Sequence, residues 1–109
     1  MKPTISYDDF DKVDVRIGTI TAASSPEWSK KLLRFEVDFG EEGKRVIFSG
    51  IRQWYDPESF VGKQFPFLLN LAPKKMGEEE SQGMMIMADG EQPTIFHMNE
   101  TVQAGAVVR

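Results

Sequence analysis

The chain of 109 residues has no cysteine, one histidine and no long apolar run. The absence of cysteine excludes disulfide bonds, thiolate zinc sites and cysteine nucleophiles. His97 cannot build a metal site alone, so we expect it at a surface or interface. No apolar stretch approaches the roughly 20 residues that span a bilayer, and residues 1–6 lack the apolar centre of a signal peptide. These features predict a soluble, cytoplasmic protein.

Sequence patterns of known catalytic sites are missing as well. The chain contains no glycine-rich phosphate loop and no nucleophile elbow. The carboxylates lie in polar runs from which no acid and base pair can be singled out. The triplet Glu78 to Glu80 is more typical of a solvated loop tip than of a cation site. We therefore predict a binding module that has no catalytic residues and needs no cofactor.

Charge is distributed unevenly along a chain whose formal net charge is −4. Residues 25–75 hold nine basic and seven acidic residues, whereas the remainder holds four basic and ten acidic ones. A basic face on an acidic body is one interpretation. An ordinary mixed surface is the other, and composition alone favours it.

Local patterns predict a mainly β structure with two short helices. Ser6 with an acid three residues later predicts one helical turn over residues 6–10, with Phe10 packed on the core. Asp56 before Pro57 predicts a second short helix over residues 56–60. Alternating apolar residues predict strands over 13–20 and 33–39. We expect further strands over 45–49, which returns after a hairpin loop, and over 64–69 and 83–88.

Two residues carry further expectations about these strands. Gly18 interrupts the alternation of the first strand and predicts a bulge there. Pro66 lacks an N–H group and predicts an exposed strand edge. The apolar run over residues 83–88 predicts a strand that is central or covered on both faces.

Curved strands with glycine corners and no alternation of strands with long helices predict an all-β fold. Five strands with a helix after the third favour a five-stranded OB-fold barrel with short N-terminal and inter-strand helices. We expect a single domain over residues 1–109, with the barrel at about 13–88 and a C-terminal extension over 89–109. Residues 102–108 are apolar and have little role in a minimal barrel, so they predict a dimer interface.

The most informative segment connects the last two predicted strands. Lys74 and Lys75 follow Pro73, which braces them at a corner, and a pair of cations beside a groove suits a phosphate backbone. Glu78 to Glu80 follow at once and would repel that backbone. We expect these glutamates on a mobile tip that turns to solvent while the lysines face the groove.

Six segments together resemble the tRNA-binding OB domain, which is found in methionyl-tRNA synthetases, free-standing tRNA-binding proteins and CsaA-type export chaperones. These are residues 9–18, 31–33, 45–51, 57–63, 70–76 and 81–84. The run Phe48 to Ile51 and the spacing from Asn70 to Met84 look most like the C-terminal domain of bacterial methionyl-tRNA synthetase. The resemblance implies a homodimer that binds tRNA by its shape. Because the chain starts at Met1 and has no catalytic domain, we expect a free-standing member.

Cations near the predicted groove would hold phosphates, polar side chains would bond to phosphate or 2′-OH groups, and a methionine would pack on ribose or bases. The candidate RNA-binding residues are Lys30, Lys31, Arg34, Arg45, Ser49, Arg52, Asn70, Lys74, Lys75, Met76 and Ser81.

Several alternatives stay open at this point. Arg34 and Arg45 fit cross-strand pairs with Glu36 or Glu42 as well as they fit RNA contacts. Met84 fits the core as well as it fits a nucleotide. Three glutamates next to the basic corner would weaken RNA binding if they faced it. A CsaA-type chaperone that binds unfolded polypeptide and a docking module for methionyl-tRNA synthetase are the alternative functions.

Overall fold

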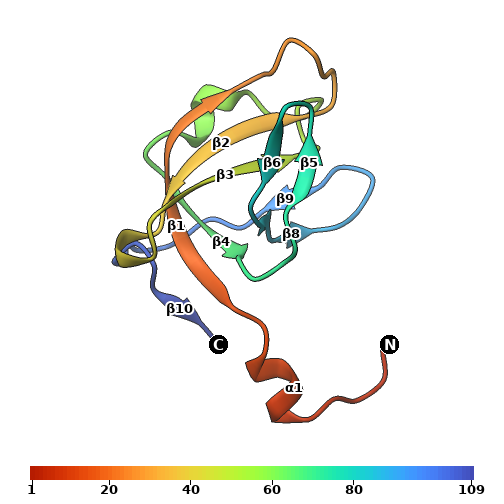
Figure 1. Cartoon of the computed structure of the whole chain (residues 1–109), viewed down its shortest axis with the longest axis vertical. Coiled ribbons are helices and arrows are strands. Elements are labelled where there is room, and N and C mark those ends of the chain that lie inside the picture. The colour runs from red at the N-terminus through yellow and green to blue at the C-terminus, as the bar shows by residue number, and fades with distance from the viewer.

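A computed structural model describes all 109 residues of the chain. Its elements run along the chain in the following order (Figure 1): α1 Tyr7–Asp11, β1 Val15–Ser24, β2 Leu33–Asp38, η1 Gly40–Glu42, β3 Lys44–Ser49, η2 Pro57–Phe60, β4 Gln64–Leu68, β5 Lys74–Met76, β6 Glu79–Ser81, β7 Met84–Met85, β8 Met87–Ala88, β9 Thr94–Ile95 and β10 Val107–Val108. No helix is both long and apolar enough to cross a membrane.

The main sheet has the strand order β3-β2-β1-β4-β7, with all pairs antiparallel, and β10 pairs with the start of β1. β3 is joined to the segment before β7, because Gln82 bonds to Val46 through both its backbone N–H (2.9 Å) and its side-chain Oε1 (3.0 Å). These bonds bring the two ends of the sheet together into a nearly closed barrel. The predicted all-β, OB-like fold is confirmed.

The interior of the barrel is apolar and rich in phenylalanine, as the alternation in β2 predicts. Phe60, on η2, packs with Phe35 and Phe65 at ring-centroid distances of 4.9 and 5.4 Å. The main core cluster consists of Ile20, Leu33, Phe35, Val37, Phe39, Ile47, Ile51, Phe60, Phe65, Phe67, Leu69 and Met85.

α1 begins at Ser6, whose hydroxyl accepts from the Asp9 N–H (3.1 Å) while the Asp9 carboxylate accepts from the Ser6 N–H (3.3 Å). The predicted capping box is therefore confirmed. The expected burial of Phe10 is wrong, because α1 buries no residue and Phe10, whose ring lies beside Tyr7, is 41% exposed. Figure 1 shows why: the helix lies at the foot of the molecule, away from the barrel.

The expectations about Gly18 and Pro66 are also wrong. Gly18 pairs regularly with Phe65, and the irregularity in β1 lies between Ile20 and Ala22. Pro66 is buried in β4 between two neighbouring strands. Its carbonyl accepts from the N–H of Ile86, so its missing N–H faces the side on which β7 has already ended.

The predicted strand over residues 83–88 is divided in two. β7 pairs with β4, whereas β8 pairs with β9 in a separate two-stranded sheet. Met84 is exposed, which contradicts the expectation that this run is covered on both faces. The change of partner at Ile86 explains why a single apolar run does not form a single strand.

Candidate nucleic-acid interface

The segment between the fourth and fifth strands of the barrel is a β-hairpin rather than the expected loop. β5 and β6 pair in register, with Lys74 opposite Ser81 and Met76 opposite Glu79. Gly77, at φ +63°, is the first residue of the two-residue turn, a position that favours glycine in hairpin turns. The tip that we expected to be mobile is therefore a regular turn, and two of its three glutamates lie in a strand.

Ser81 fastens the hairpin to the barrel. Its hydroxyl accepts from the N–H of Phe48 in β3 (3.0 Å) and donates to the carbonyl of Gly83 (3.0 Å). The residue is 5% exposed. Ser81 was predicted from the sequence as an RNA contact, but in the structure its hydroxyl is committed to positioning the hairpin.

Arg34 in β2 makes the second attachment of the hairpin. Its Nε and Nη2 donate to the two carboxylate oxygens of Glu79 at 2.7 and 2.9 Å, and its Nη1 donates to Glu36 at 2.9 Å. The bond from Arg34 lowers the pKa of Glu79, and the same bond raises the pKa of Arg34. Arg34 does pair with Glu36, but both residues lie in β2, so this is a pair within one strand and not the expected cross-strand pair. Glu79 binds an arginine of its own chain instead of facing an incoming phosphate.

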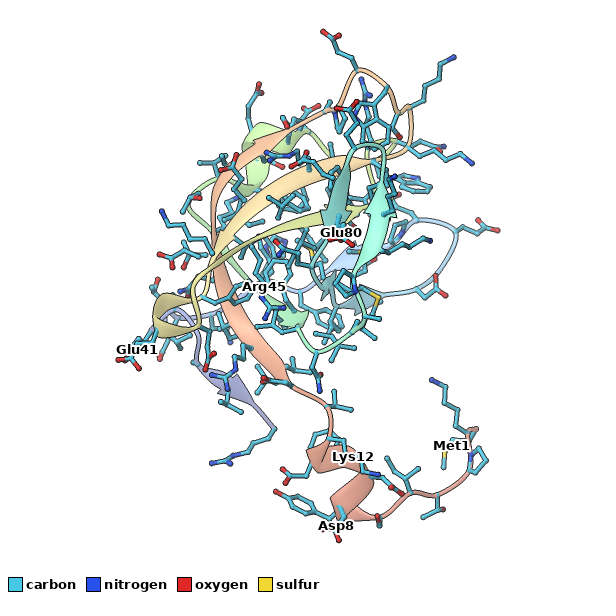
Figure 2. The ribbon with its side chains drawn as sticks, in the orientation of Figure 1. Met1, Asp8, Lys12, Glu41, Arg45 and Glu80 are labelled. Carbon is cyan, nitrogen blue, oxygen red and sulfur yellow. The ribbon has the colours of Figure 1, made fainter.

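Arg45, another predicted RNA contact, bonds to backbone carbonyls of its own chain. Arg45, labelled in Figure 2, donates from Nη1 to the carbonyls of Leu69 (2.8 Å) and Gln82 (3.1 Å). The alternative pair with Glu42 does not form, because Glu42 binds Arg16 at 3.2 Å.

Arg52 and Asn70 have internal partners of the same kind. Arg52 donates to the carbonyls of Pro26 (3.0 Å) and Ser29 and so braces the loop between β1 and β2. Asn70 accepts from the N–H of Asp14 (2.8 Å) and donates to the carbonyl of Lys12 (2.6 Å). The polar groups that these two residues offer are used to hold loops in place.

Four of the predicted cations are exposed and have no acidic partner within 4.0 Å. Lys30 and Lys31 lie in the loop between β1 and β2, and Lys74 and Lys75 lie in β5. The loop and the hairpin touch, since the Trp28 ring lies against Gly77 in the hairpin turn. The structure thus brings these two lysine pairs onto adjoining segments.

Two further candidate residues, Met76 and Ser49, each line a pocket. Met76 and Trp28 line one of about 410 Å³ together with Gly77, Glu78 and Glu79. Ser49 lines a larger one of about 510 Å³, in which the other lining residues are mainly apolar: Phe48, Gly50, Ile51, Met84, Met85, Ile86, Met87, Asp89 and Pro93.

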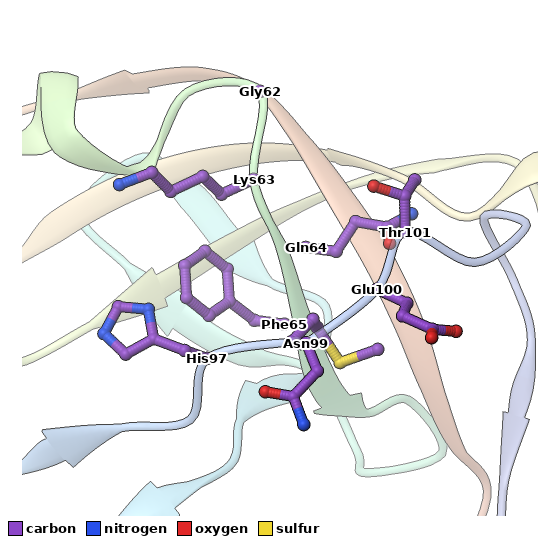
Figure 3. A pocket seen from close by; sticks show the side chains of 9 residues that line it. Gly62, Lys63, Gln64, Phe65, His97, Asn99, Glu100 and Thr101 are labelled. Atoms are coloured by element: carbon purple, nitrogen blue, oxygen red, sulfur yellow. The ribbon is translucent and has the colours of Figure 1, made fainter.

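A third pocket, of about 300 Å³, lies between the start of β4 and the C-terminal extension. Figure 3 shows the Phe65 ring between the side chains of Lys63 and His97, with Gln64 and Thr101 on the other side of the strand. The side-chain amide of Gln64 donates from Nε2 to the carbonyl of Val102 (2.7 Å) and accepts at Oε1 from the N–H of Val102 (2.9 Å), which holds the extension on the barrel. None of the eleven candidate residues lines this pocket.

Comparison with known proteins identifies the family. A family model described as a putative tRNA binding domain matches residues 15–107. The chain belongs to the tRNA-binding domain family. The resemblance inferred from the sequence is therefore confirmed. The family is one of binding modules without catalytic residues of their own, although the domain also occurs joined to an enzyme.

Methionine–tRNA ligases share this tRNA-binding domain. The ligase of Xylella fastidiosa (strain M12) is 46% identical over 110 residues, which cover 98% of this chain and 16% of the ligase. That of Stenotrophomonas maltophilia is 48% identical over 109 residues, covering 97% of this chain and 16% of the ligase. The chain thus spans about a sixth of the length of these curated relatives.

Two solved structures of the same fold cover nearly the whole chain. A MetRS-related protein from Pyrococcus horikoshii has a TM-score of 0.91 and 36% identity, covering 99% of this chain and 100% of that one. The chaperone CsaA from Bacillus anthracis has a TM-score of 0.88 and 27% identity, covering 98% of this chain and 100% of that one. The tRNA-binding domain is thus shared by proteins with different described roles.

Proposed function

We propose that this chain binds tRNA through the face formed by residues 25–32 and the β5–β6 hairpin. The observation that supports it is the set of four exposed, unpaired lysines, Lys30, Lys31, Lys74 and Lys75, on two segments that touch. Such lysines can exchange counterions for phosphates. Met76, half-buried beside them, would pack on ribose or a base.

In this proposal the five candidate residues that bond within the chain act indirectly. Arg34 and Ser81 fix the hairpin, and Arg52 fixes the loop that carries Lys30 and Lys31. Contacts by lysines to phosphates carry no base-sequence information, which suits recognition of tRNA by its shape. A tRNA ligand also supports a cytoplasmic location.

Charge reversal tests the proposed face. Lys74→Glu with Lys75→Glu should abolish most tRNA binding at low salt and reduce the slope of log affinity against log salt by about two. Lys44→Glu with Lys63→Glu is the matched control, because both lysines are exposed and unpaired but lie elsewhere on the barrel. Equal losses in the two double variants would contradict a localised site, and absence of tRNA binding by the parent chain would contradict the function.

Binding of unfolded polypeptide is the second candidate. The pocket lined by Phe48, Ile51 and Met84 to Met87 supports it, because flexible methionines suit varied apolar side chains. Met84→Lys should then remove suppression of aggregation of a denatured client, while leaving tRNA binding unchanged. Competition between tRNA and the client would show that both ligands bind one face, and it would contradict two separate binding sites.

We also propose that the protein is a homodimer or docks on a synthetase through the face shared by α1 and β10. Phe10 and Val13 line a pocket of about 340 Å³ together with Val107 and Val108, and all four are exposed. α1 buries none of its residues on the barrel and projects from it, as the positions of Asp8 and Lys12 in Figure 2 make visible. A second copy would cover this apolar surface.

A further inference from the structure

We propose that Trp28 and the β5–β6 turn form a stacking site for one unpaired nucleobase of RNA. The proposal deepens the tRNA-binding function and rests on it. It adds to the lysine contacts a place where an unstacked base is held.

The exposure of Trp28 is the first observation. Its residue surface is 56% exposed, whereas the other tryptophan, Trp54, packs against the main core. Indole is among the largest apolar side chains, and its exposure in a loop is costly unless a ligand covers it. Aromatic side chains on which bases stack are a common means of binding single-stranded nucleic acid.

The position of the ring is fixed before any ligand binds. A Cβ atom at Gly77 would lie 2.9 Å from Cζ2 and 3.0 Å from Cε2 of Trp28, so the glycine allows the indole to lie directly on the hairpin turn. The Phe48 ring supports the indole, with 6.0 Å between the ring centroids and 52° between the ring planes. Arg52 bonds to the carbonyls of Pro26 and Ser29, on either side of Trp28. A preorganised ring loses little entropy when a base stacks on it.

The groups around the Trp28 ring favour a nucleobase inside the adjoining pocket and phosphates outside it. The adjoining pocket of about 410 Å³ is lined by the Met76 thioether and by Glu78, which forms no ion pair. A carboxylate at this place repels phosphate but not an uncharged base. The exposed lysines stand just outside, with Lys30 two residues after Trp28 and Lys75 two residues before Gly77.

Fluorescence of Trp28 tests the site directly. In a Trp54→Phe variant, Trp28 is the only tryptophan. A short single-stranded RNA and tRNA should each quench its emission and shield it from acrylamide. A blunt RNA duplex and polyphosphate, which carry charge but offer no unstacked base, should leave it unchanged. Equal quenching by polyphosphate, or tRNA binding without any change at Trp28, would overturn the stacking site while leaving the proposed function standing.

Substitutions separate stacking from packing. Trp28→Ala should weaken binding of the single-stranded RNA by about 5- to 100-fold, the range that base–aromatic stacking supports. Trp28→Phe should restore most of the affinity because it keeps an aromatic face. Trp28→Leu should not, although it is apolar. The proposal would be overturned if leucine restored RNA affinity as fully as phenylalanine. It would also be overturned if the Trp28 fluorescence responded to denatured polypeptide but not to RNA. Absence of tRNA binding by the unsubstituted chain would contradict the underlying function instead.

Discussion

At the scale of single residues, Gly18 shows that close packing of neighbouring side chains can require a residue without a Cβ atom. A Cβ at this position would overlap Cγ1 of Val37 and lie 2.5 Å from Cε1 of Phe39, and both residues belong to the main core. The residue is glycine because the side chains of Val37 and Phe39 lie directly over it, and no bulge is involved.

Gly18→Ala should therefore lower the free energy of unfolding by about 1–3 kcal/mol, the usual cost of overpacking. Gly50→Ala is the control, since a Cβ there meets nothing within 4 Å and the backbone does not have positive φ. Urea denaturation of the two variants measures the difference. If Gly50→Ala lowered the free energy of unfolding as much as Gly18→Ala, overpacking would be excluded as the cause.

The bond between Arg34 and Glu79 makes the stability pH-dependent. The pKa of Glu79 is lowered below its ordinary 4.5, so the pair stabilises the fold above about pH 4.5 and this contribution disappears as the pH falls through the lowered value. Because the pair is partly exposed and screened by water, Glu79→Gln should cost only about 0.5 kcal/mol near pH 7.

Glu80→Gln serves as the matched variant for that measurement, because Glu80 is exposed and unpaired in the same strand. Urea midpoints should differ between the two variants near neutral pH and coincide in strong acid. A difference that persists in acid would show that Glu79 stabilises the hairpin by packing instead of charge.

How far the sequence predicts the site depends on residue type. Lys30, Lys31, Lys74 and Lys75 keep their side chains free, as expected of flexible, strongly hydrated cations. Ser81, by contrast, bonds internally. Arginines, amides and hydroxyls bond to backbone groups as readily as to a ligand, and the choice depends on tertiary contacts that no local pattern contains.

At the scale of elements, the β5–β6 hairpin is where sequence reasoning gave a loop. Three adjacent glutamates indicate a solvated tip, but the alternation of Lys74, Met76, Glu79 and Ser81 on one face suits a short strand pair. The deciding interaction is the long-range bond between Glu79 and Arg34, 45 residues apart. β2, in which buried and more exposed residues alternate along the whole strand, was predictable from its period alone.

Replacing Gly77 should disturb the Trp28 ring, whereas replacing Gly43 should not. Both glycines have positive φ, so alanine introduces similar backbone strain at each. Only at Gly77 does the new Cβ meet the indole; nothing lies within 4 Å at Gly43. In the Trp54→Phe background, Gly77→Ala should increase acrylamide quenching of Trp28. Equal quenching in both variants would show that strain, not contact, moves the ring.

At the scale of the whole molecule, the exposed apolar face of α1 and β10 predicts assembly. Light scattering at micromolar concentration should give about twice the chain mass of 12.4 kDa, and Phe10→Ser with Val108→Ser should give a single chain mass. Val61→Ser removes an exposed apolar side chain elsewhere and should leave the dimer intact. A monomeric parent protein would contradict the dimer and favour docking on another protein.

The side chain of Asn70 also has a consequence for the order of folding. It joins the segment between α1 and β1 to the segment after β4 through contacts that span 56 and 58 residues of sequence. The β1–β4 ladder spans a similar separation, with Val15 opposite Leu68, so once that ladder has formed the Asn70 contacts need little further loop-closure entropy. The helix at the start of the chain is therefore anchored late, and the Asp14 amide should gain hydrogen-exchange protection only after the β1–β4 ladder has formed.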